Sequence, residues 1–486
     1  MQNSNLKILF VVSEMAPFAK IGGLGDFSGA LPFEMASLGM DVRIVMPKYK
    51  QISEQYTHSM EYICDYSVNL DWRKQTAIIR KLDFDNSRGN IPCYFIDNAY
   101  YFDRQQMYSH PDDAERFAFF CKAVLEMLPK INFMPDIIHC NDWETGPICV
   151  LLHQQYKHLD FYKHIKTIFT IHNLQCQGNF PKDTLSLLGL GEEFYHPDSL
   201  EFYGSVNYMK AGIVYSDIIT TVSATYAKEI QMPEYGNGLD GVIRKRQTDL
   251  FGIINGIDYN TYNPETDSYI YQNYNYNSLD KKQINKIKFQ KEFGLEENSE
   301  IPLIAMISHL SDEKGFDLIE ESIEEMMQMN LQFIILGTGD PIYEDLIDSM
   351  QHKYSNKMRA LIVFNIELAH KIFAASDIYL MPSKFEACGL NQMIALRYGS
   401  VPIARATGGL ADTIIPFDMQ NCDGSGFIFK EHCKQSMLFT LKTAIELYQT
   451  YPSAWKQMVM RGMKQNFSWN ASASQYEKLY HKLIES

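Results

Sequence analysis

Short apolar runs alternate with helical patterns along most of the chain, and this alternation limits the possible folds more than any other feature. Each run is rich in Val, Ile, Leu or Phe and is followed by polar residues or by Gly and Pro. Continuous apolar strands separated by helices predict parallel sheets that are covered on both faces. The runs form two series, which predict two doubly wound α/β domains: 7–13, 41–47, 91–97, 136–140, 167–172 and 217–222, then 301–308, 332–337, 360–364, 378–382 and 401–404.

The length of the chain also favours two domains, because 486 residues exceed what one hydrophobic core usually supports. We place the boundary after residue 258, so that residues 1–258 form one domain and 259–455 the next. Residues 259–280 are dense in Tyr and Asn without a strong period, and we interpret them as a solvated linker. An aromatic surface that contacts sugars is the alternative. Residues 456–486 have a helical pattern.

Composition and charge argue against several classes of protein. The formal net charge of −15 disfavours a nucleic-acid binder, because phosphate partners need a basic face. Nine scattered cysteines without a CxxC pair argue against a zinc ribbon and indicate reduced thiols in a cytosol. The apolar run 8–12 is too short for a signal peptide, and no stretch approaches the roughly 20 apolar residues of a membrane span. We expect a soluble, cytoplasmic protein with neither nucleic-acid nor membrane partners.

A glycine-rich loop follows the first predicted strand, with the sequence Lys20-Ile21-Gly22-Gly23-Leu24-Gly25-Asp26. Glycines at the N-terminus of a helix let backbone N–H groups approach an anion closely. Ser28 replaces the third glycine of a dinucleotide site, and the second strand ends in Met46-Pro47-Lys48 without an acidic residue for a ribose. Both features argue against NAD. A tight turn is the plainer alternative.

Two more loops follow predicted strands in the second half of the chain. Ser383–Gln392 combines a turn that carries a carboxylate, Glu386, with the start of a helix. Such a strand, turn and helix N-terminus form a seat for a diphosphate beside a sugar. Glu386 is placed to accept hydrogen bonds from hydroxyl groups, and charge capping of the helix is the alternative. Thr407–Asp412 is another glycine-rich loop after a strand.

Together these motifs resemble the bacterial glycogen synthase and plant starch synthase family. The resemblance rests on Lys20–Asp26, on Phe385–Gln392 and on Ala406–Thr413. Supporting pieces occur in the order of the family: Asn141-Asp142-Trp143, Ile171–Leu174 with Gln177-Gly178, Ile254–Asp258, Glu313-Lys314-Gly315, and Phe364-Asn365 with Leu368-Ala369-His370. The match runs from about residue 7 to about residue 480.

The resemblance implies a GT-B fold, which has two Rossmann-like doubly wound domains and an interdomain cleft. The first domain of this family binds the acceptor glucan, the second binds the nucleotide sugar, and the last helix packs back on the first domain. Glucose is transferred with retention to the non-reducing end of an α-1,4-glucan, without a metal or another cofactor. Most bacterial and plant relatives use ADP-glucose, and UDP-glucose stays open for this chain. The oligomeric state is not indicated.

The family's functional residues are carried over to the matching positions. The expected catalytic residues are Lys20, Asp142, His172, Lys314 and Glu386, and the expected donor-binding residues are Gly23, Asp26, Asn255, His309, Phe364, Cys388, Gly389, Leu390 and Asn391. Negative charge builds up on a departing nucleoside diphosphate, so fixed positive charge must face it. The resemblance gives this role to Lys20 and Lys314, with amides of the two loops.

The resemblance also assigns the remaining contacts with the sugar and the base. The roles it implies are glucose binding by Glu386, His172 and Asn255, a place nearer the acceptor for Asp142 and Asp26, and contact with the base for Phe364. Plainer explanations stay open for single residues, such as a helix N-cap for Asp142 and a turn at Asn255.

One position departs from the family pattern. The family has Ser-Arg-Leu where this chain reads Ser308-His309-Leu310, so His309 replaces the Arg that grips the diphosphate. Arg stays charged and offers a planar fork, whereas a free imidazole has a pKa near 6.5. A weakly active or non-catalytic paralogue is therefore one alternative function. Another retaining GT-B transferase and a nucleotide-sugar epimerase are two more.

Overall fold

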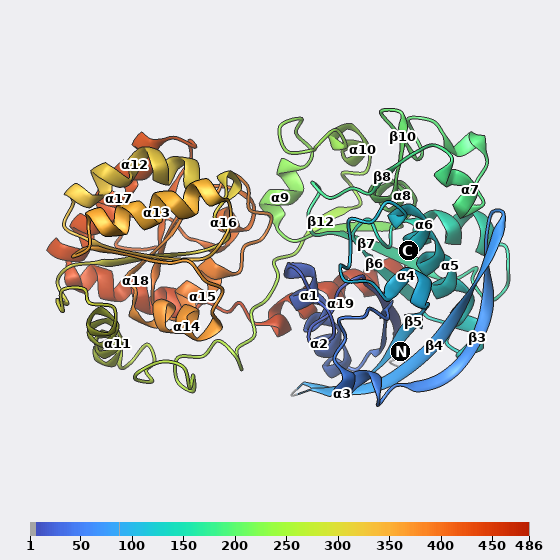
Figure 1. Ribbon diagram of the computed structural model, residues 1–486, viewed down its shortest axis with the longest axis horizontal. Helices are drawn as coiled ribbons and strands as arrows, with labels where there is room; N and C mark the ends of the chain where they lie inside the picture. The colour runs from blue at the N-terminus through green and yellow to red at the C-terminus, as the bar shows by residue number, and fades with distance from the viewer. Residues whose placement is uncertain (1–5, 87, 486) are drawn as a thin grey trace. The chain divides into compact units, whose positions relative to one another are not determined.

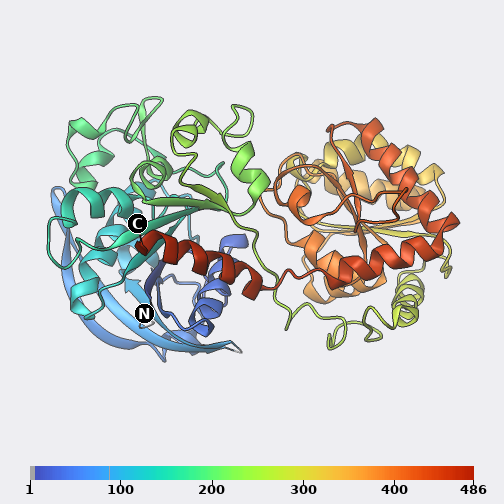
Figure 2. The same ribbon diagram turned by 180° about the vertical axis from the view of Figure 1, so that it is seen from behind.

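The computed structural model describes residues 6–86 and 88–485, and these residues form two compact units. The chain passes from unit 1 to unit 2 between Ile253 and Ile254 and returns to unit 1 between Ser468 and Trp469. Figure 1 and Figure 2 show the elements of each unit from opposite sides. Within the described residues, no helix has both the length and the apolar character that crossing a membrane requires.

These crossing points differ from the predicted boundaries at residues 258 and 455. Ile257 pairs with Ser468 in an isolated β-bridge, and the Tyr259 hydroxyl donates to the carbonyl of Gln465 at 3.1 Å. The two crossing segments therefore hold each other and belong to the same unit. Of the predicted C-terminal segment 456–486, only α19 (Trp469–Glu485) belongs to unit 1. There, Tyr480 is hydrogen-bonded to His139 at 2.6 Å.

Unit 1 contains a nine-stranded sheet in the order β12-β11-β7-β6-β1-β2-β5-β4-β3. Neighbouring strands are parallel except in two pairs: β4 runs antiparallel to β5 and to β3. A separate three-stranded sheet has the order β8-β10-β9. The strands are β1 (Lys7–Val11), β2 (Asp41–Pro47), β3 (Glu61–Leu70), β4 (Arg73–Asn86), β5 (Gly89–Asp97), β6 (Ile137–Asn141), β7 (Lys166–Ile171), β8 (Asn179–Phe180), β9 (Glu201–Phe202), β10 (Ser205–Asn207), β11 (Ile218–Thr221) and β12 (Leu250–Gly252).

Helices cover the large sheet of unit 1 on both faces, as the buried apolar strands require (Figures 1 and 2). Besides α19 they are α1 (Gly23–Ser28), α2 (Leu31–Ser37), α3 (Glu54–Thr57), α4 (Ala99–Phe102), α5 (Asp113–Lys130), α6 (Pro147–Leu151), α7 (Thr184–Leu188), α8 (Tyr208–Tyr215), α9 (Ala224–Glu229) and α10 (Asp240–Lys245), with short π and 3-10 turns at Leu152–Tyr156 and Glu192–Phe194. The helical segment after the glycine-rich loop is divided into α1 and α2, because Pro32 lacks an N–H group for a continuous helix and suits the first turn of α2.

The continuous apolar runs in the sequence do not predict β3 and β4. Their side chains alternate between buried and exposed, so neither strand forms a continuous apolar run. Alternation is typical of an antiparallel hairpin with one face in the core and one in water. The long curved ribbon of β3 and β4 forms one edge of unit 1 (Figure 1).

Unit 2 contains a six-stranded, fully parallel sheet in the order β15-β14-β13-β16-β17-β18. The strands are β13 (Leu303–Ile307), β14 (Gln332–Leu336), β15 (Met358–Leu361), β16 (Ile378–Met381), β17 (Val401–Arg405) and β18 (Phe427–Phe429). The helices are α11 (Leu279–Glu292), α12 (Phe316–Gln328), α13 (Pro341–Lys353), α14 (Ile366–Ala375), α15 (Asn391–Arg397), α16 (Gly408–Thr413), α17 (Lys434–Thr450) and α18 (Pro452–Lys464), with a 3-10 turn at Asp312–Lys314. The sequence pattern predicts five of these strands.

The expectation that residues 259–280 form a solvated linker is wrong. Asp267 is buried and its carboxylate lies 2.7 Å from Nδ1 of His370 on α14, while the Tyr398 hydroxyl donates to it at 2.6 Å. Burial raises the pKa of Asp267, but the hydrogen bonds from His370 and Tyr398 outweigh burial and hold it below its ordinary value. The segment 259–280 is therefore packed against unit 2 and is anchored there by a buried cluster of hydrogen-bonded polar side chains.

We predict that Asp267→Asn destabilises unit 2. Removing one partner of a buried pair leaves the other poorly compensated and costs on the order of 3 kcal/mol. Urea unfolding of the full chain measures the loss, with the exposed Asp345→Asn on α13 as the matched control. Equal midpoints for the two variants contradict the anchoring role.

Candidate functional site

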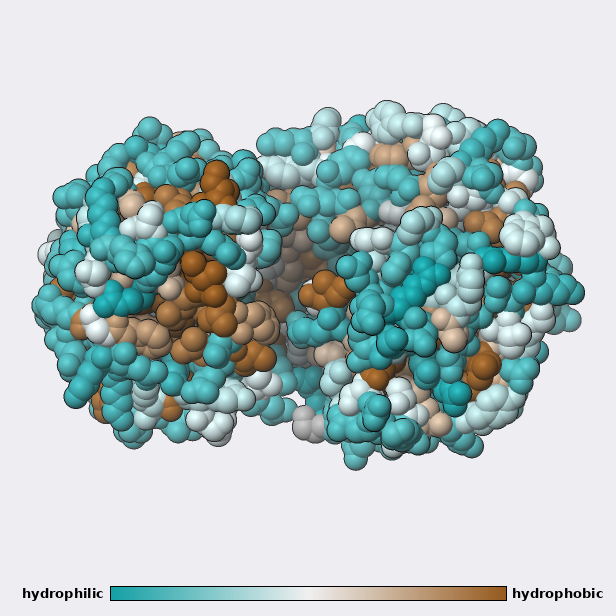
Figure 3. All heavy atoms as spheres, in the orientation of Figure 1, coloured by the Kyte–Doolittle hydropathy of each residue, from teal (hydrophilic) through white to brown (hydrophobic). Residues whose placement is uncertain are grey.

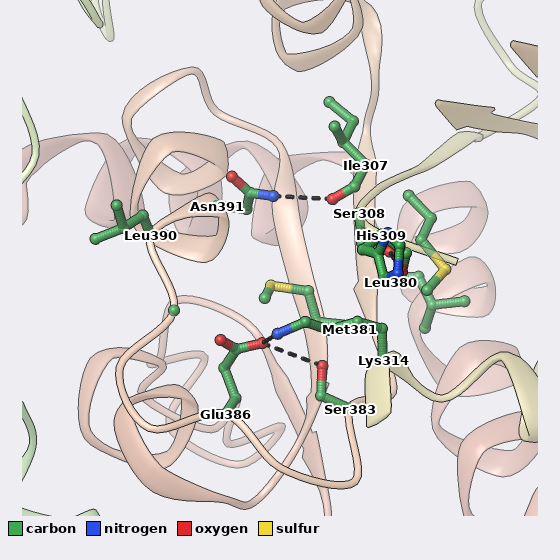
Figure 4. A pocket seen from close by; sticks show the side chains of 12 residues that line it. Ile307, Ser308, His309, Lys314, Leu380, Met381, Ser383, Glu386, Leu390 and Asn391 are labelled. Carbon is green, nitrogen blue, oxygen red and sulfur yellow. Dashed lines mark hydrogen bonds and ion pairs between the residues drawn. The ribbon is translucent and has the colours of Figure 1, made fainter. Parts of the chain in front are cut away.

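The strand order of unit 2 creates a crevice between β13 and β16. From β13 the chain proceeds to β14 and β15 on one side, whereas β16, β17 and β18 lie on the other. In open parallel sheets, ligands bind outside the carboxyl ends of the strands at such a switch point. A cavity of about 210 Å³ lies there, and it is lined by Met306, Ile307, Ser308, His309, Lys314, Leu380, Met381, Ser383, Glu386, Gly389, Leu390 and Asn391 (Figure 4).

An ion pair between Lys314 and Glu386 dominates this cavity. The Lys314 Nζ lies 2.8 Å from an Oε2 of Glu386, which also accepts a longer bond of 3.4 Å from Ser383 (Figure 4). Burial lowers the pKa of Lys314, but the Glu386 carboxylate outweighs burial and holds the pKa above its ordinary value. Lys314 is therefore a cation at neutral pH. An ammonium group has three donors, so the pair leaves donors for an anionic ligand.

Close backbone contacts fix the two loops that carry this pair. Lys384 donates its N–H to the carbonyl of Glu313 at 2.8 Å. Gly315 has φ +83°, and a Cβ there would lie 2.3 Å from the carbonyl oxygen of Pro382. Only glycine fits both the conformation and the space. The Lys-Gly step of the motif thus places Lys314 directly against the loop after β16.

The glycine-rich loop after β17 supports Glu386 from the other side. A Cβ on Gly408, which has φ +41°, would lie 2.0 Å from the carbonyl oxygen of Glu386. The Gly409 N–H is shared between the carbonyls of Glu386 and Ala387, at 3.3 and 3.1 Å. Arg405 donates to the carbonyls of Ser383 and Lys384 and is buried. The third motif therefore holds the turn that carries Glu386 and lies outside the cavity lining.

The start of α15 closes the cavity on one side. Asn391 donates from Nδ2 to the carbonyl of Ile307 at 2.8 Å, which ties the helix to the end of β13 (Figure 4). Gly389 has φ +70° and stands just before this helix. The first N–H groups of a helix have no acceptor within it, so this end suits an anion. Gly389, Leu390 and Asn391 all line the cavity, and their role in donor binding stays a prediction.

The other expected donor-binding residues of unit 2 lie in three different settings. His309 is exposed and lines the cavity. Asn255 is buried, and its Oδ1 has no partner among the described residues. Cys388 is buried and lies outside the cavity lining; burial raises the pKa of its thiol to about 12, despite a hydrogen bond from the Asn255 backbone. Its thiol therefore packs in the interior of unit 2, and its role in donor binding stays a prediction.

Phe364 lies outside the cavity lining but at the same edge of the sheet. β15 ends at Leu361, shorter than expected, so Phe364 stands in the loop before α14 and is 85% exposed. Its strand is two positions from β13, which corresponds to about 10 Å across the sheet. Hydrophobic surface gathers on the visible face of unit 2 (Figure 3). An exposed aromatic ring at this distance suits the base of a nucleotide.

Unit 1 repeats the same topology at its own switch point between β1 and β6. The loop with Lys20 follows β1, and Asp142 follows β6. Lys20 forms an ion pair with Asp26 at 2.6 Å, and both side chains are nearly half exposed. Gly23 begins α1. The expected residues of unit 1 thus come together at one sheet edge.

Glu14 is a site residue that the motifs did not single out. Its Oε2 accepts the N–H groups of Ile21 and Gly22 at 2.6 and 3.0 Å, and Tyr108 donates to its Oε1 at 3.0 Å. The expectation that amides of this loop face a diphosphate is therefore wrong for Ile21 and Gly22. Their N–H groups hold a buried carboxylate of the protein itself. The position of Glu14 just after β1 was the available signal.

His172 is held as a neutral imidazole. Asn141 donates from Nδ2 to the carbonyls of Val11 and His139, so its Oδ1 faces His172 Nε2 at 3.0 Å. The Nε2 atom must then carry the proton, which leaves Nδ1 as an acceptor. Burial lowers the pKa of His172 to about 3. The neutral ring therefore supplies no charge, and its Nδ1 atom can accept a hydrogen bond from a hydroxyl group.

Asp142 supports this arrangement from a strained backbone position. It has φ +56°, and its Oδ1 accepts the N–H of His172 at 2.7 Å. Burial raises the pKa of Asp142 to about 7; the bond from the His172 backbone opposes the rise and the Glu14 carboxylate adds to it. Burial and Asp142 likewise raise the pKa of Glu144. Asp142 and Glu144 thus lie with Glu14 in one buried region, and the raised pKa values of Asp142 and Glu144 favour their protonated forms.

Across residues 6–86 and 88–485, no group of three His, Cys, Asp or Glu side chains is arranged to hold a metal ion.

Two family models match the chain, one for each unit. The starch synthase catalytic domain matches residues 7–245, and glycosyl transferases group 1 matches residues 287–456.

Similar proteins cover nearly the whole chain. Glycogen synthases of Desulforudis audaxviator and Moorella thermoacetica are 46% and 48% identical, and each alignment covers 99% of this chain and 97% or 98% of the relative. The catalytic domain of starch synthase IV from Arabidopsis thaliana, bound to ADP and acarbose, is 33% identical with a TM-score of 0.87, over 99% of this chain and 100% of that one. Sucrose-phosphate synthase of Thermosynechococcus elongatus, at 16% identity and a TM-score of 0.60, shares the fold.

We predict that Asp142→Asn stabilises the protein increasingly as the pH rises from 5 to 8. A carboxyl group whose pKa is raised on folding lowers the free energy of unfolding above its ordinary pKa, and this loss grows until its folded pKa near 7 is passed. Asn has no such loss. Thermal unfolding at the two pH values measures the effect, and the 97% exposed Asp160→Asn is the control. A difference independent of pH contradicts the assignment.

Proposed function

The chain belongs to the glycogen synthase and starch synthase family and is a glucosyltransferase that makes glycogen, and we propose that ADP-glucose is its donor. Glucose is transferred with retention at the anomeric carbon to the non-reducing end of an α-1,4-glucan, and the transfer needs no metal. The fold is the GT-B fold of its structural relatives. Unit 2 takes the nucleotide sugar, and unit 1 takes the glucan.

The single observation that carries the proposal is the Lys314–Glu386 pair at the switch point of unit 2. Departure of a nucleoside diphosphate builds up negative charge, and a fixed cation beside it lowers the barrier. Lys314 stays protonated and keeps free donors for this charge. Glu386 fixes Lys314 and has its second carboxylate oxygen available for a sugar hydroxyl.

His172 and Asp142 then serve orientation in unit 1. A neutral imidazole with Nδ1 as acceptor binds a sugar hydroxyl without adding charge that competes with Lys20. Asp142 sets the position of His172 through its backbone N–H. Correct orientation of the reacting groups lowers the entropic part of the barrier.

The base of the donor is the finer part of the proposal. The starch synthase IV relative was solved with ADP and acarbose bound. Phe364 at the sheet edge offers an exposed ring for a purine. We also infer a cytoplasmic location, because all nine cysteines are free thiols and free thiols suit a reducing compartment.

A donor comparison tests the proposed function. Purified protein is incubated with glycogen and radiolabelled ADP-glucose or UDP-glucose at equal concentrations, with and without EDTA. We expect incorporation from ADP-glucose to exceed that from UDP-glucose at least tenfold and EDTA to leave it unchanged. Faster transfer from UDP-glucose contradicts the donor assignment, and no transfer from either supports a non-catalytic paralogue.

We predict that Lys314→Ala lowers kcat by roughly 10²–10³ at a temperature at which thermal unfolding shows the variant to be fully folded. The matched control is Lys384→Ala in the neighbouring loop, whose side chain is half exposed and pairs with Asp317 at 3.0 Å. Lys20→Ala tests the corresponding cation of unit 1 and is expected to lower kcat strongly as well. Near-normal turnover of Lys314→Ala rules out its role at the leaving group.

A further inference from the structure

The hairpin of β3 and β4 ends in an aromatic cluster that the proposed reaction does not explain. Trp72 at the hairpin tip is 77% exposed and Tyr100 on α4 is 56% exposed. The guanidinium carbon of Arg73 lies 5.2 Å from the ring centroid of each. Two large aromatic side chains therefore surround one guanidinium group at the surface. Exposed aromatic side chains that gather in one place are a feature of interaction sites, in contrast to hydrophobic residues scattered singly over a surface.

Ion pairs and ring contacts hold this cluster rigidly. Arg73 forms an ion pair with Glu115 and donates to the Tyr101 hydroxyl at 3.2 Å. Arg104 donates to both carboxylate oxygens of Asp112 at 2.6 Å and to the carbonyl of Tyr100 at 3.0 Å. Both guanidinium groups are thus neutralised by carboxylates of the protein. The cluster offers fixed aromatic faces without net positive charge, which suits a neutral ligand better than an anion.

The cluster lies on the same side of unit 1 as the reacting groups. The last pair between β4 and β5 joins Ile78 to Asp97, so residues 73–77 extend beyond the carboxyl end of β5. At 3.4 Å per residue this extension is about 17 Å. Lys20 and Asp142 follow the carboxyl ends of strands parallel to β5, so their side chains lie beyond the same edge.

A buried chain of contacts joins the cluster to the loop with Lys20. Arg116 is fully buried and donates to the carbonyls of Tyr101 and Met107 at 2.8 and 3.2 Å. The next residue, Tyr108, bonds Glu14, which holds the loop after Lys20. The aromatic cluster and the reacting groups are therefore parts of one rigid surface, separated along the sheet by the width of several strands.

We propose that Trp72 and Tyr100 form a platform that binds the acceptor α-1,4-glucan several sugar units away from its reacting end. The inference rests on the proposed function, which supplies a long neutral polymer as acceptor. The faces of glucose rings carry C–H groups, and these pack against aromatic rings with burial of apolar surface. A second contact on the same chain raises the effective concentration of its end at the reacting groups.

The test separates long acceptors from short ones. Trp72→Ala, Tyr100→Ala and the double variant are compared with wild type for glycogen binding without donor, by affinity electrophoresis. Kinetics with ADP-glucose then use glycogen or maltotriose as acceptor. We expect the Kd and KM for glycogen to rise roughly tenfold, while kcat and the KM for maltotriose stay unchanged. Tyr203→Ala removes another aromatic residue of unit 1, 82% exposed, and is the control without an expected effect.

Three results overturn the proposal. Wild-type affinity for glycogen in the double variant shows that the platform does not bind the polymer. An equal rise of KM for maltotriose shows that the residues act at the reacting end. A wild-type dimer that becomes monomeric in the variants, with glycogen binding unchanged, makes the cluster a contact between copies. Platform-dependent binding of glycogen without transfer from either donor supports the platform and contradicts the proposed function.

Discussion

The ion pair between Lys314 and Glu386 is the interaction on which the rest of the donor region depends. Removing two charges from water is costly, and the attraction between them recovers that cost only with good geometry. The chain secures this geometry with backbone contacts that exclude any side chain at Gly315 and Gly408. Stability alone does not require such a pair, since apolar residues fill a core as well. A fixed cation beside a departing diphosphate does require it.

The two units share one topological arrangement, but the charged groups at their switch points differ in sign. Each sheet changes direction next to its central strand, and each places its polar loops beyond the carboxyl ends there. Unit 2 gathers a protonated Lys314 and helix N–H groups, which favour an anion. Unit 1 gathers Glu14, Asp142 and Glu144, whose burial raises the pKa of the last two. Carboxyl groups in such a region exchange hydrogen bonds with hydroxyl groups, which suits the neutral glucan that we propose for unit 1.

The sequence predicts what repeats with a strong period and misses what depends on tertiary contact. Continuous apolar strands such as Asp41–Pro47 have the predicted bounds, because burial on both faces leaves a clear pattern. In the hairpin of β3 and β4, buried and exposed side chains alternate, and the search for continuous apolar runs does not find these strands. The motifs brought Lys314 and Glu386 together, but nothing local shows that Asp267 meets His370 across 103 residues. The position of Glu14 just after β1 is a weak signal, because its partners are backbone amides and these have no sequence signature.

The most direct test of this account is a structure of the protein crystallised with ADP. The account predicts that the diphosphate lies at the switch point of unit 2, with an oxygen within about 3.2 Å of the Lys314 Nζ and near the first N–H groups of α15. It also predicts that the adenine lies against Phe364. A diphosphate bound to unit 1 beside Lys20 alone, with Lys314 in contact only with Glu386, contradicts the account.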